Sequence, residues 1–272
     1  MKPGEVDARW LAQLRAGSDM PPLRPRVPLL ATALGGAVIG SVEPGFLAQI
    51  VPPRLADGRK ALEPATGVRQ RGWLLHGDVT QSLALVALAL REAGLAHAWR
   101  DEQLAVPDAH GERAGTVERA VIRVLGITTH AVHLVGQAPD GRIWVQQRSF
   151  AKSNDPGLWD TLMGGMVSAA DSLQTALERE TWEEAGLVLS SLQDVVWGGR
   201  ITTRRPAADG GGAGYVIEHI DWYRSTVPEG VVPVNQDGEV ERFALVDRRQ
   251  LAAGLQQGEF TAEAALILCD AL

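Results

Sequence analysis

Residues 164–187 read GGMVSAADSLQTALERETWEEAGL, a stretch that predicts a glycine turn, a helix and a glycine stop. Asp171 is the expected N-cap residue, and Gln174, three positions later, completes a capping box. Gly186 suits the left-handed conformation that often follows the last turn of a helix. Local sequence therefore predicts a helix over about residues 171–185.

Three glutamates, Glu180, Glu183 and Glu184, share one face of this helix, because successive residues are about 100° apart. Apolar residues one to two turns earlier lie on the same face, which is therefore expected to point inward. Partly buried like charges repel each other unless a cation is held between them. Mg²⁺ prefers oxygen ligands that are completed by water and substrate phosphates. We expect a Mg²⁺ site here, at which Mn²⁺ is an alternative, and a separate packing partner for Trp182 on the opposite side.

The spacing of these residues resembles the signature of the Nudix family. That signature is Gly, five residues, Glu, seven residues, Arg-Glu, an aliphatic, any residue, Glu-Glu, any residue, Gly and an aliphatic. Asp171 stands where the signature has Glu, and Thr181 stands where it has an aliphatic residue. Neither departure removes an expected metal ligand. The positions that match are Gly165, Arg179, Glu180, Glu183, Glu184, Gly186 and Leu187.

Further segments resemble a Nudix subgroup that has an extra N-terminal domain and is related to the Nudix portion fused to thiamine pyrophosphokinase in fungi. The resemblance implies an α/β fold, a Nudix-type α/β/α sandwich with a mixed sheet. It also implies metal-dependent hydrolysis of a diphosphate bond in a nucleoside- or cofactor-diphosphate derivative, such as a thiamine diphosphate-like compound. The segments that carry it are His133-Leu-Val-Gly136, Arg148-Ser149, Lys152 and the stretch Asp237 to Phe243.

The proposed chemistry assigns roles to individual residues. Metal ions held by Glu180, Glu183 and Glu184 would neutralise the diphosphate and activate a water for in-line attack. Arg179 is expected to orient a glutamate rather than to bind phosphate. The general base remains open between a signature glutamate and three distant ones, Glu239, Glu241 and Glu218. The expected catalytic residues are Glu183, Glu184, Arg179 and Glu239, and the expected substrate-binding residues are Arg148, Lys152, Trp159, Gly164 and Gly165.

A domain boundary is expected near residue 127, where the sequence changes to strand-like alternation. Residues 1–127 are predicted to form a smaller α+β accessory domain that covers or shapes the substrate cleft, and residues 128–272 a Nudix hydrolase domain. The first part is expected to contain helices over 8–18, 80–94 and 115–125 and a hairpin over 29–33 and 37–42. Strands are expected in the second part over 130–136, 142–147, 215–224 and about 240–246.

Composition limits the partners of the chain. Its 272 residues carry a net charge of −7, which is unsuited to neutralising a nucleic-acid backbone. The N-terminus lacks the pattern of a secretory signal, and no apolar stretch is long enough to cross a membrane. The single cysteine, Cys269, cannot form an internal disulfide. We expect a cytoplasmic monomer or homodimer with a small-molecule diphosphate substrate and with no nucleic-acid or membrane partner.

Two alternative functions remain open on the same fold. A non-catalytic, ligand-sensing Nudix protein would be expected to lose signature glutamates, which are intact here. An isoprenoid diphosphate isomerase-like enzyme would need an active-site cysteine, and Cys269 lies far from the signature in sequence.

Overall fold

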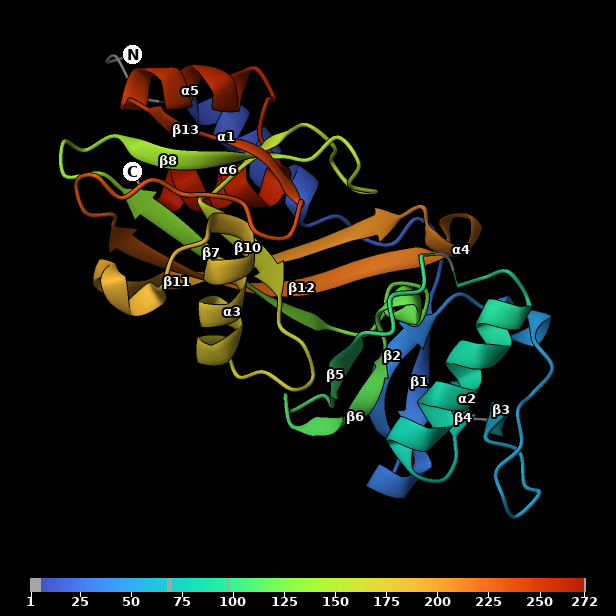
Figure 1. Cartoon of the computed structure of the whole chain (residues 1–272). Coiled ribbons are helices and arrows are strands. Elements are labelled where there is room, and N and C mark those ends of the chain that lie inside the picture. Colours follow the sequence, from blue (N-terminus) through green and yellow to red (C-terminus); the bar gives the residue numbers. More distant parts are fainter. Residues whose placement is uncertain (1–5, 68–69, 97, 272) are drawn as a thin grey trace.

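The first part of the chain forms a small α+β unit. In the computed structural model, which describes residues 6–67, 70–96 and 98–271, a four-stranded sheet has the order β2-β1-β4-β3 (Figure 1). Helix α2 packs against β4 and against β6 of a separate two-stranded sheet. The elements of this unit are β1 (Val27–Ala31), η1 (Thr32–Leu34), β2 (Ala37–Val42), η2 (Phe46–Gln49), β3 (Leu62–Gly67), β4 (Gln70–Leu75), α2 (Val79–Glu92), β5 (Gln103–Pro107), β6 (Arg113–Glu118) and η3 (Arg119–Val121).

A larger sheet of seven strands follows. Its main path is β11-β12-β7-β8-β13, while β10 pairs with β7 and β9 pairs with β8. Strand β12 runs parallel to β7 and the other pairs are antiparallel, so the sheet is mixed. Its strands are β7 (Thr129–Gln137), β8 (Ile143–Arg148), β9 (Trp159–Asp160), β10 (Met163–Met166), β11 (Gln193–Ala207), β12 (Gly214–Thr226) and β13 (Val240–Val246).

Helices cover both faces of this sheet. Because side chains alternate along a strand, Val132 and Leu134 of β7 pack on the α3 side, whereas Ala131 and Val135 pack with α5 and α6 on the other. This arrangement confirms the predicted α/β/α sandwich with a mixed sheet, preceded by a smaller α+β part. The helical segments are α3 (Leu173–Ala185), η4 (Leu189–Ser191), α4 (Asp209–Gly212), α5 (Arg248–Gln256) and α6 (Ala262–Ala271). No helix in the described ranges is long and apolar enough to span a membrane.

The first helix of the chain packs with the larger sheet rather than with the smaller one. Helix α1 (Ala8–Ser18), at the predicted position, contacts α6 and β11, and Trp10 and Leu14 join the core beside α6. Arg15 forms an ion pair with Asp270 at 3.1 Å. The domain boundary near residue 127 stays a prediction.

The helix predicted over 115–125 is wrong. Strand β6 occupies its first half and the short η3 turn follows. Strand β6 pairs with β5, which places Val117 opposite Leu104. Gly115 permits a close approach to α2, because a Cβ atom there would lie 2.9 Å from the hydroxyl oxygen of Thr80. Tertiary pairing therefore overrides the helical spacing of the apolar residues.

Two details of helix α3 also differ from expectation. Ser172, not Asp171, is the N-cap residue, and its capping box is completed by Thr175 rather than Gln174. The carboxylate of Asp171 is engaged instead by the guanidinium of Arg179, at 2.8 and 3.0 Å. The expected packing partner of Trp182 is not found, since this residue is 51% exposed.

Replacing Ser172 with Ala should destabilise the protein by about 1 kcal/mol, the usual cost of losing an N-cap hydroxyl. Chemical denaturation provides the measurement, with Ser191→Ala as a control because Ser191 caps no comparable helix. An unchanged free energy of unfolding in Ser172→Ala would contradict the assigned cap.

Candidate active site

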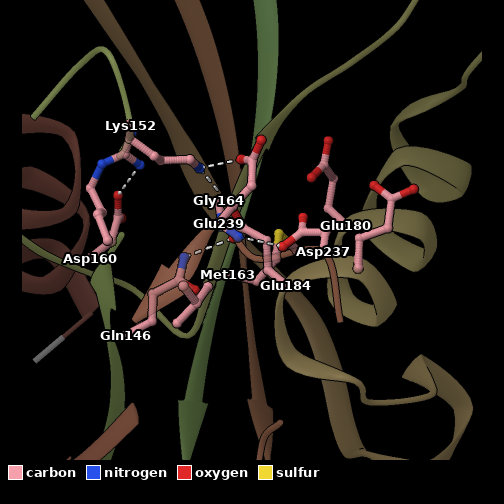
Figure 2. A network of polar contacts seen from close by, with 12 residues as sticks. Gln146, Lys152, Asp160, Met163, Gly164, Glu180, Glu184, Asp237 and Glu239 are labelled. Carbon is pink, nitrogen blue, oxygen red and sulfur yellow. Dashed lines mark hydrogen bonds and ion pairs between the residues drawn. The ribbon is translucent and has the colours of Figure 1, made fainter. Parts of the chain in front are cut away.

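The signature helix borders a cleft with a volume of about 410 Å³. Its other walls come from the loop before β9, the loop before β13 and the first part of the chain. Figure 2 shows Lys152 reaching toward Glu239 and Glu184, while Glu180 lies on the α3 side. Of the residues expected to bind metal or substrate, the cleft brings together Arg148, Lys152, Gly164, Gly165, Glu180, Glu183 and Glu184.

Glu184 is the most deeply buried carboxylate of the cleft, with 1% of its surface exposed. One oxygen accepts hydrogen bonds from the backbone N–H of Gly164 at 2.9 Å and from the Gln146 amide at 2.7 Å. The other oxygen lies 3.4 Å from the ammonium of Lys152. Burial raises the pKa of Glu184, although Lys152 and these hydrogen bonds oppose the shift. The carboxylate is thus held in place by residues of β8 and β10 and by the ammonium of Lys152.

Glu180 lies one turn earlier and packs directly on the glycine turn. A Cβ atom on Gly165 would collide with its carboxyl group, so glycine at this position lets Glu180 take its present place. Burial, followed by the charge of Glu184, raises the pKa of Glu180 to about 7. The burial and neighbouring negative charge that favour a proton on this carboxyl group also favour a divalent cation in its place.

Arg179 connects the remaining carboxylates of the helix. It donates to Glu180 and to Glu183, each at 2.9 Å, and it also holds Asp171. Glu183 is more accessible than Glu180 and Glu184, with 41% of its side chain exposed. The shorter Asp171, found where the family signature has Glu, still reaches the guanidinium. Arg179 therefore contacts three carboxylates at once, and its expected orienting role stays a prediction.

Lys152 and Arg148 extend the network along the loop before β9. Lys152 forms an ion pair with Glu239 as well as with Glu184. Burial opposes ionisation of Glu239, but the hydrogen bond and charge of Lys152, with smaller effects of Arg119 and Arg100, hold its pKa below the usual value. Arg148 lies 3.4 Å from the buried Asp160.

Some expected residues lie elsewhere. Trp159 packs against the core of the α6 side, under the guanidinium of Arg242 at 5.2 Å, and does not line the cleft. Strand β9 pairs with β8, which directs the ring to that side. Glu241 is exposed on β13 outside the cleft, whereas Glu218 on β12 lies in the cleft wall.

Several residues that line or support the cleft were not expected from the sequence. Gln146 is an ordinary residue of an alternating strand, and nothing in its spacing indicates that it donates to Glu184. Three arginines of the first part lie in no recognised motif, and only the fold brings them to the cleft. These unexpected residues include Gln146, Asp160, Arg100, Arg119 and Arg123.

The donor set fits a hard divalent cation. Among the described residues, no group of three or more carboxylate, imidazole or thiolate side chains is close enough to form a complete metal site. Mg²⁺ commonly uses only one or two carboxylates and completes its shell with water and substrate phosphates. Glu180, Glu183 and Glu184, on one turn at the edge of an open cleft, suit that mode of binding.

Comparison with known proteins agrees with this architecture. Residues 128–267 match the protein family described as NUDIX domain. The chain therefore belongs to the Nudix family.

Individual relatives are about 30% identical to the chain over the aligned segments. Nudix hydrolase 20, chloroplastic, of Arabidopsis thaliana is 30% identical over 200 residues, which are 72% of this chain and 52% of the relative. Nudix hydrolase 24, chloroplastic, of the same plant is 28% identical over 210 residues, 71% of this chain and 53% of the relative. The chain thus spans about half the length of these curated relatives. The solved structure of DR0079 from Deinococcus radiodurans is 19% identical with a TM-score of 0.46, and the match covers 62% of this chain and 99% of that one.

Gly165→Ala should weaken Mg²⁺ binding, because the added methyl group displaces the carboxyl of Glu180. The measurement is the rise in melting temperature with added Mg²⁺. The variant should need a several-fold higher Mg²⁺ concentration than the wild type to reach the same rise. Gly17→Ala is the control, since nothing lies within 4 Å of the added atom. Equal Mg²⁺ responses in the two variants would argue against this placement of Glu180.

The raised pKa of Glu180 predicts a pH-dependent stability of the metal-free protein. In the folded protein the Glu180 carboxyl keeps its proton up to about pH 7, whereas the ordinary pKa of a glutamate is 4.5. Protonation of Glu180 therefore contributes fully to the stability of the fold below pH 4.5, and this contribution is lost as the pH rises through 7. With chelator present, Glu180→Gln should gain stability relative to the wild type between about pH 5 and 8. Thermal unfolding measures this difference, and Glu178→Gln, an exposed change on the same helix, should show none.

Proposed function

We propose that this protein hydrolyses a diphosphate bond in a nucleoside- or cofactor-diphosphate derivative and depends on Mg²⁺ or Mn²⁺. The observation that carries this proposal is the presence of Glu180, Glu183 and Glu184 on one turn of α3, along a cleft and with Glu184 buried. A merely solvated acidic surface would not bury a carboxylate against a glycine turn. When bound, the cation neutralises phosphate oxygens and lowers the pKa of a coordinated water.

The residues of the chain have separable roles in this reaction. Arg179 holds Glu180 and Glu183 at the cleft edge through charge-assisted hydrogen bonds. The backbone N–H of Gly164 and the amide of Gln146 hold Glu184. These fixed contacts reduce the reorganisation that binding would otherwise require.

Lys152 and Glu239 are placed to act on substrate and water. The ammonium of Lys152 lies between Glu184 and Glu239 and can turn to a phosphate oxygen when a cation neutralises Glu184. Glu239 then loses its partner and becomes available to accept the proton of the attacking water. While Glu239 is paired with Lys152, its pKa lies below the usual value. Glu218 is the second candidate for the base, although burial, with the charge of Glu263, raises its pKa.

The organic part of the substrate would extend into a smaller pocket of about 80 Å³ that shares Arg100, Arg119 and Glu218 with the cleft. This pocket is lined in part by Ile122 and Ile127. Thiamine diphosphate and its oxidised forms are the first compounds to test, because the sequence resembles the Nudix subgroup related to the portion fused to fungal thiamine pyrophosphokinase.

The isomerase-like alternative is less well supported. Cys269 lies on α6, packs beside the core there and does not line the cleft. Burial, followed by the charge of Asp270, raises the pKa of its thiol to about 11, which disfavours a reactive thiolate.

The alternative of a non-catalytic, ligand-sensing protein predicts binding of a diphosphate without turnover.

A panel of diphosphate-containing metabolites, including thiamine diphosphate, should reveal metal-dependent release of phosphate or a monophosphate. Glu183→Gln should lower kcat/KM by orders of magnitude, since it removes a charged ligand without disturbing the core. Glu184→Gln should do the same. Glu178→Gln, on the exposed side of α3, is the matched control and should retain activity. Near-normal turnover by Glu183→Gln and Glu184→Gln would remove the assigned roles.

A further inference from the structure

The first part of the chain contributes residues to the lining of the cleft. Arg100, Arg119 and Arg123 all line the cleft that contains the signature glutamates. Arg119 lies on η3, Arg123 follows it closely, and Arg100 precedes β5. We call these three residues the arginine wall.

Arg100 is presented by a strained segment. Ala98 and Asp101, on either side of it, have φ values of 54° and 56°, in the left-handed region that residues other than glycine seldom adopt. The segment is held by a hydrogen bond from the Trp99 indole to Asp101 at 2.7 Å, and the guanidinium of Arg91 lies 4.5 Å from the centre of the Trp99 ring. Strain of this kind persists only where surrounding contacts enforce it, and it concentrates at binding sites.

A buried carboxylate joins this segment to η3. Glu118 is 2% exposed, and one of its oxygens accepts hydrogen bonds from the backbone N–H of Arg100 at 3.0 Å and from that of Ala120 at 3.3 Å. Arg119 is fixed separately, by an ion pair with Glu102 at 2.7 Å. The backbone of Arg100 and the side chain of Arg119 are therefore held by contacts within the protein, which lowers the entropic cost of binding.

The arginine wall has unused hydrogen-bond donors. A guanidinium carries five N–H groups. Arg119 donates to Glu102, and Arg123 lies 3.4 Å from Asp209. Within the described part of the chain, the side chain of Arg100 has no hydrogen-bond or ion-pair partner. Most N–H groups of the wall are thus available to a ligand.

A diphosphate is the ligand that suits both the glutamates of α3 and the arginine wall. Glutamates on α3 repel phosphate unless a cation intervenes, whereas guanidinium groups bind phosphate oxygens directly and in pairs. Arg119 and Arg100 are close enough to Glu239 for their charges to contribute to lowering its pKa, so the arginine wall lies near this glutamate of the same cleft. A diphosphate that occupies the cleft would therefore meet both the α3 glutamates and these arginines.

Resting on the function proposed above, we propose that the arginine wall binds the phosphate of the substrate diphosphate that is farther from α3. The active site is then composite, with the cation-binding half in the Nudix sandwich and a phosphate-binding half in the first part of the chain. This assigns a binding role to a region that has no signature motif.

The test measures binding of methylenediphosphonate, a diphosphate analogue that cannot be hydrolysed at its bridge, by calorimetry on the full chain. Arg100→Gln should weaken binding about tenfold, or about 1.4 kcal/mol, and should leave the fold intact because Arg100 is exposed. Arg119→Gln and Arg123→Gln should show similar losses. Arg100→Lys should recover part of the affinity, since it keeps the charge and loses the paired donors. Arg71→Gln, an exposed change outside the cleft, is the control.

Titrations with and without Mg²⁺ separate this proposal from the proposed function. Weaker binding in the arginine variants, together with a Mg²⁺ effect that Glu183→Gln removes, supports both. Weaker binding with no effect of Mg²⁺ supports the arginine wall and contradicts the cation-dependent function. Wild-type affinity in all three arginine variants, or no binding of the analogue by the wild type, overturns the arginine wall.

Discussion

The structure of the site depends on one electrostatic constraint, the gathering of three carboxylates on a single turn of α3 where Glu184 is buried. Such a group is unfavourable unless cations surround it. Arg179 binds the group from within the helix, and Lys152 approaches it from the facing loop. The glycine turn serves the same group, since the backbone N–H of Gly164 donates to Glu184 and the missing side chain of Gly165 leaves room for the carboxyl group of Glu180.

The sandwich provides the rigidity that this arrangement requires. Strands β8 and β10 hold two partners of Glu184, and the packing of α3 on β7 and β10 fixes the helix that carries the glutamates. The first part of the chain also contributes to the lining of the cleft. The side chains that line the cleft therefore come from segments far apart in the sequence. Each segment is held by contacts of its own, such as the hydrogen bonds that Glu118 accepts.

Local patterns predicted α3, its glycine stop and the strands around the Pro139–Gly141 turn, because caps, turns and alternation depend on neighbouring residues. They failed where tertiary contacts decide the outcome. Residues 113–118 form a strand because they pair with β5, and Trp159 turns to the core because β9 pairs with β8. The glutamates could be predicted from spacing on a helix. Arg100, Arg119 and Arg123 could not, because their proximity to the glutamates arises only from the packing of two sheets.

The contact of Lys152 with Glu184 and Glu239 provides an internal counterion for the buried carboxylate. The fold therefore does not rely on an external cation to balance the charge of Glu184, unlike small domains that collapse only around their metal.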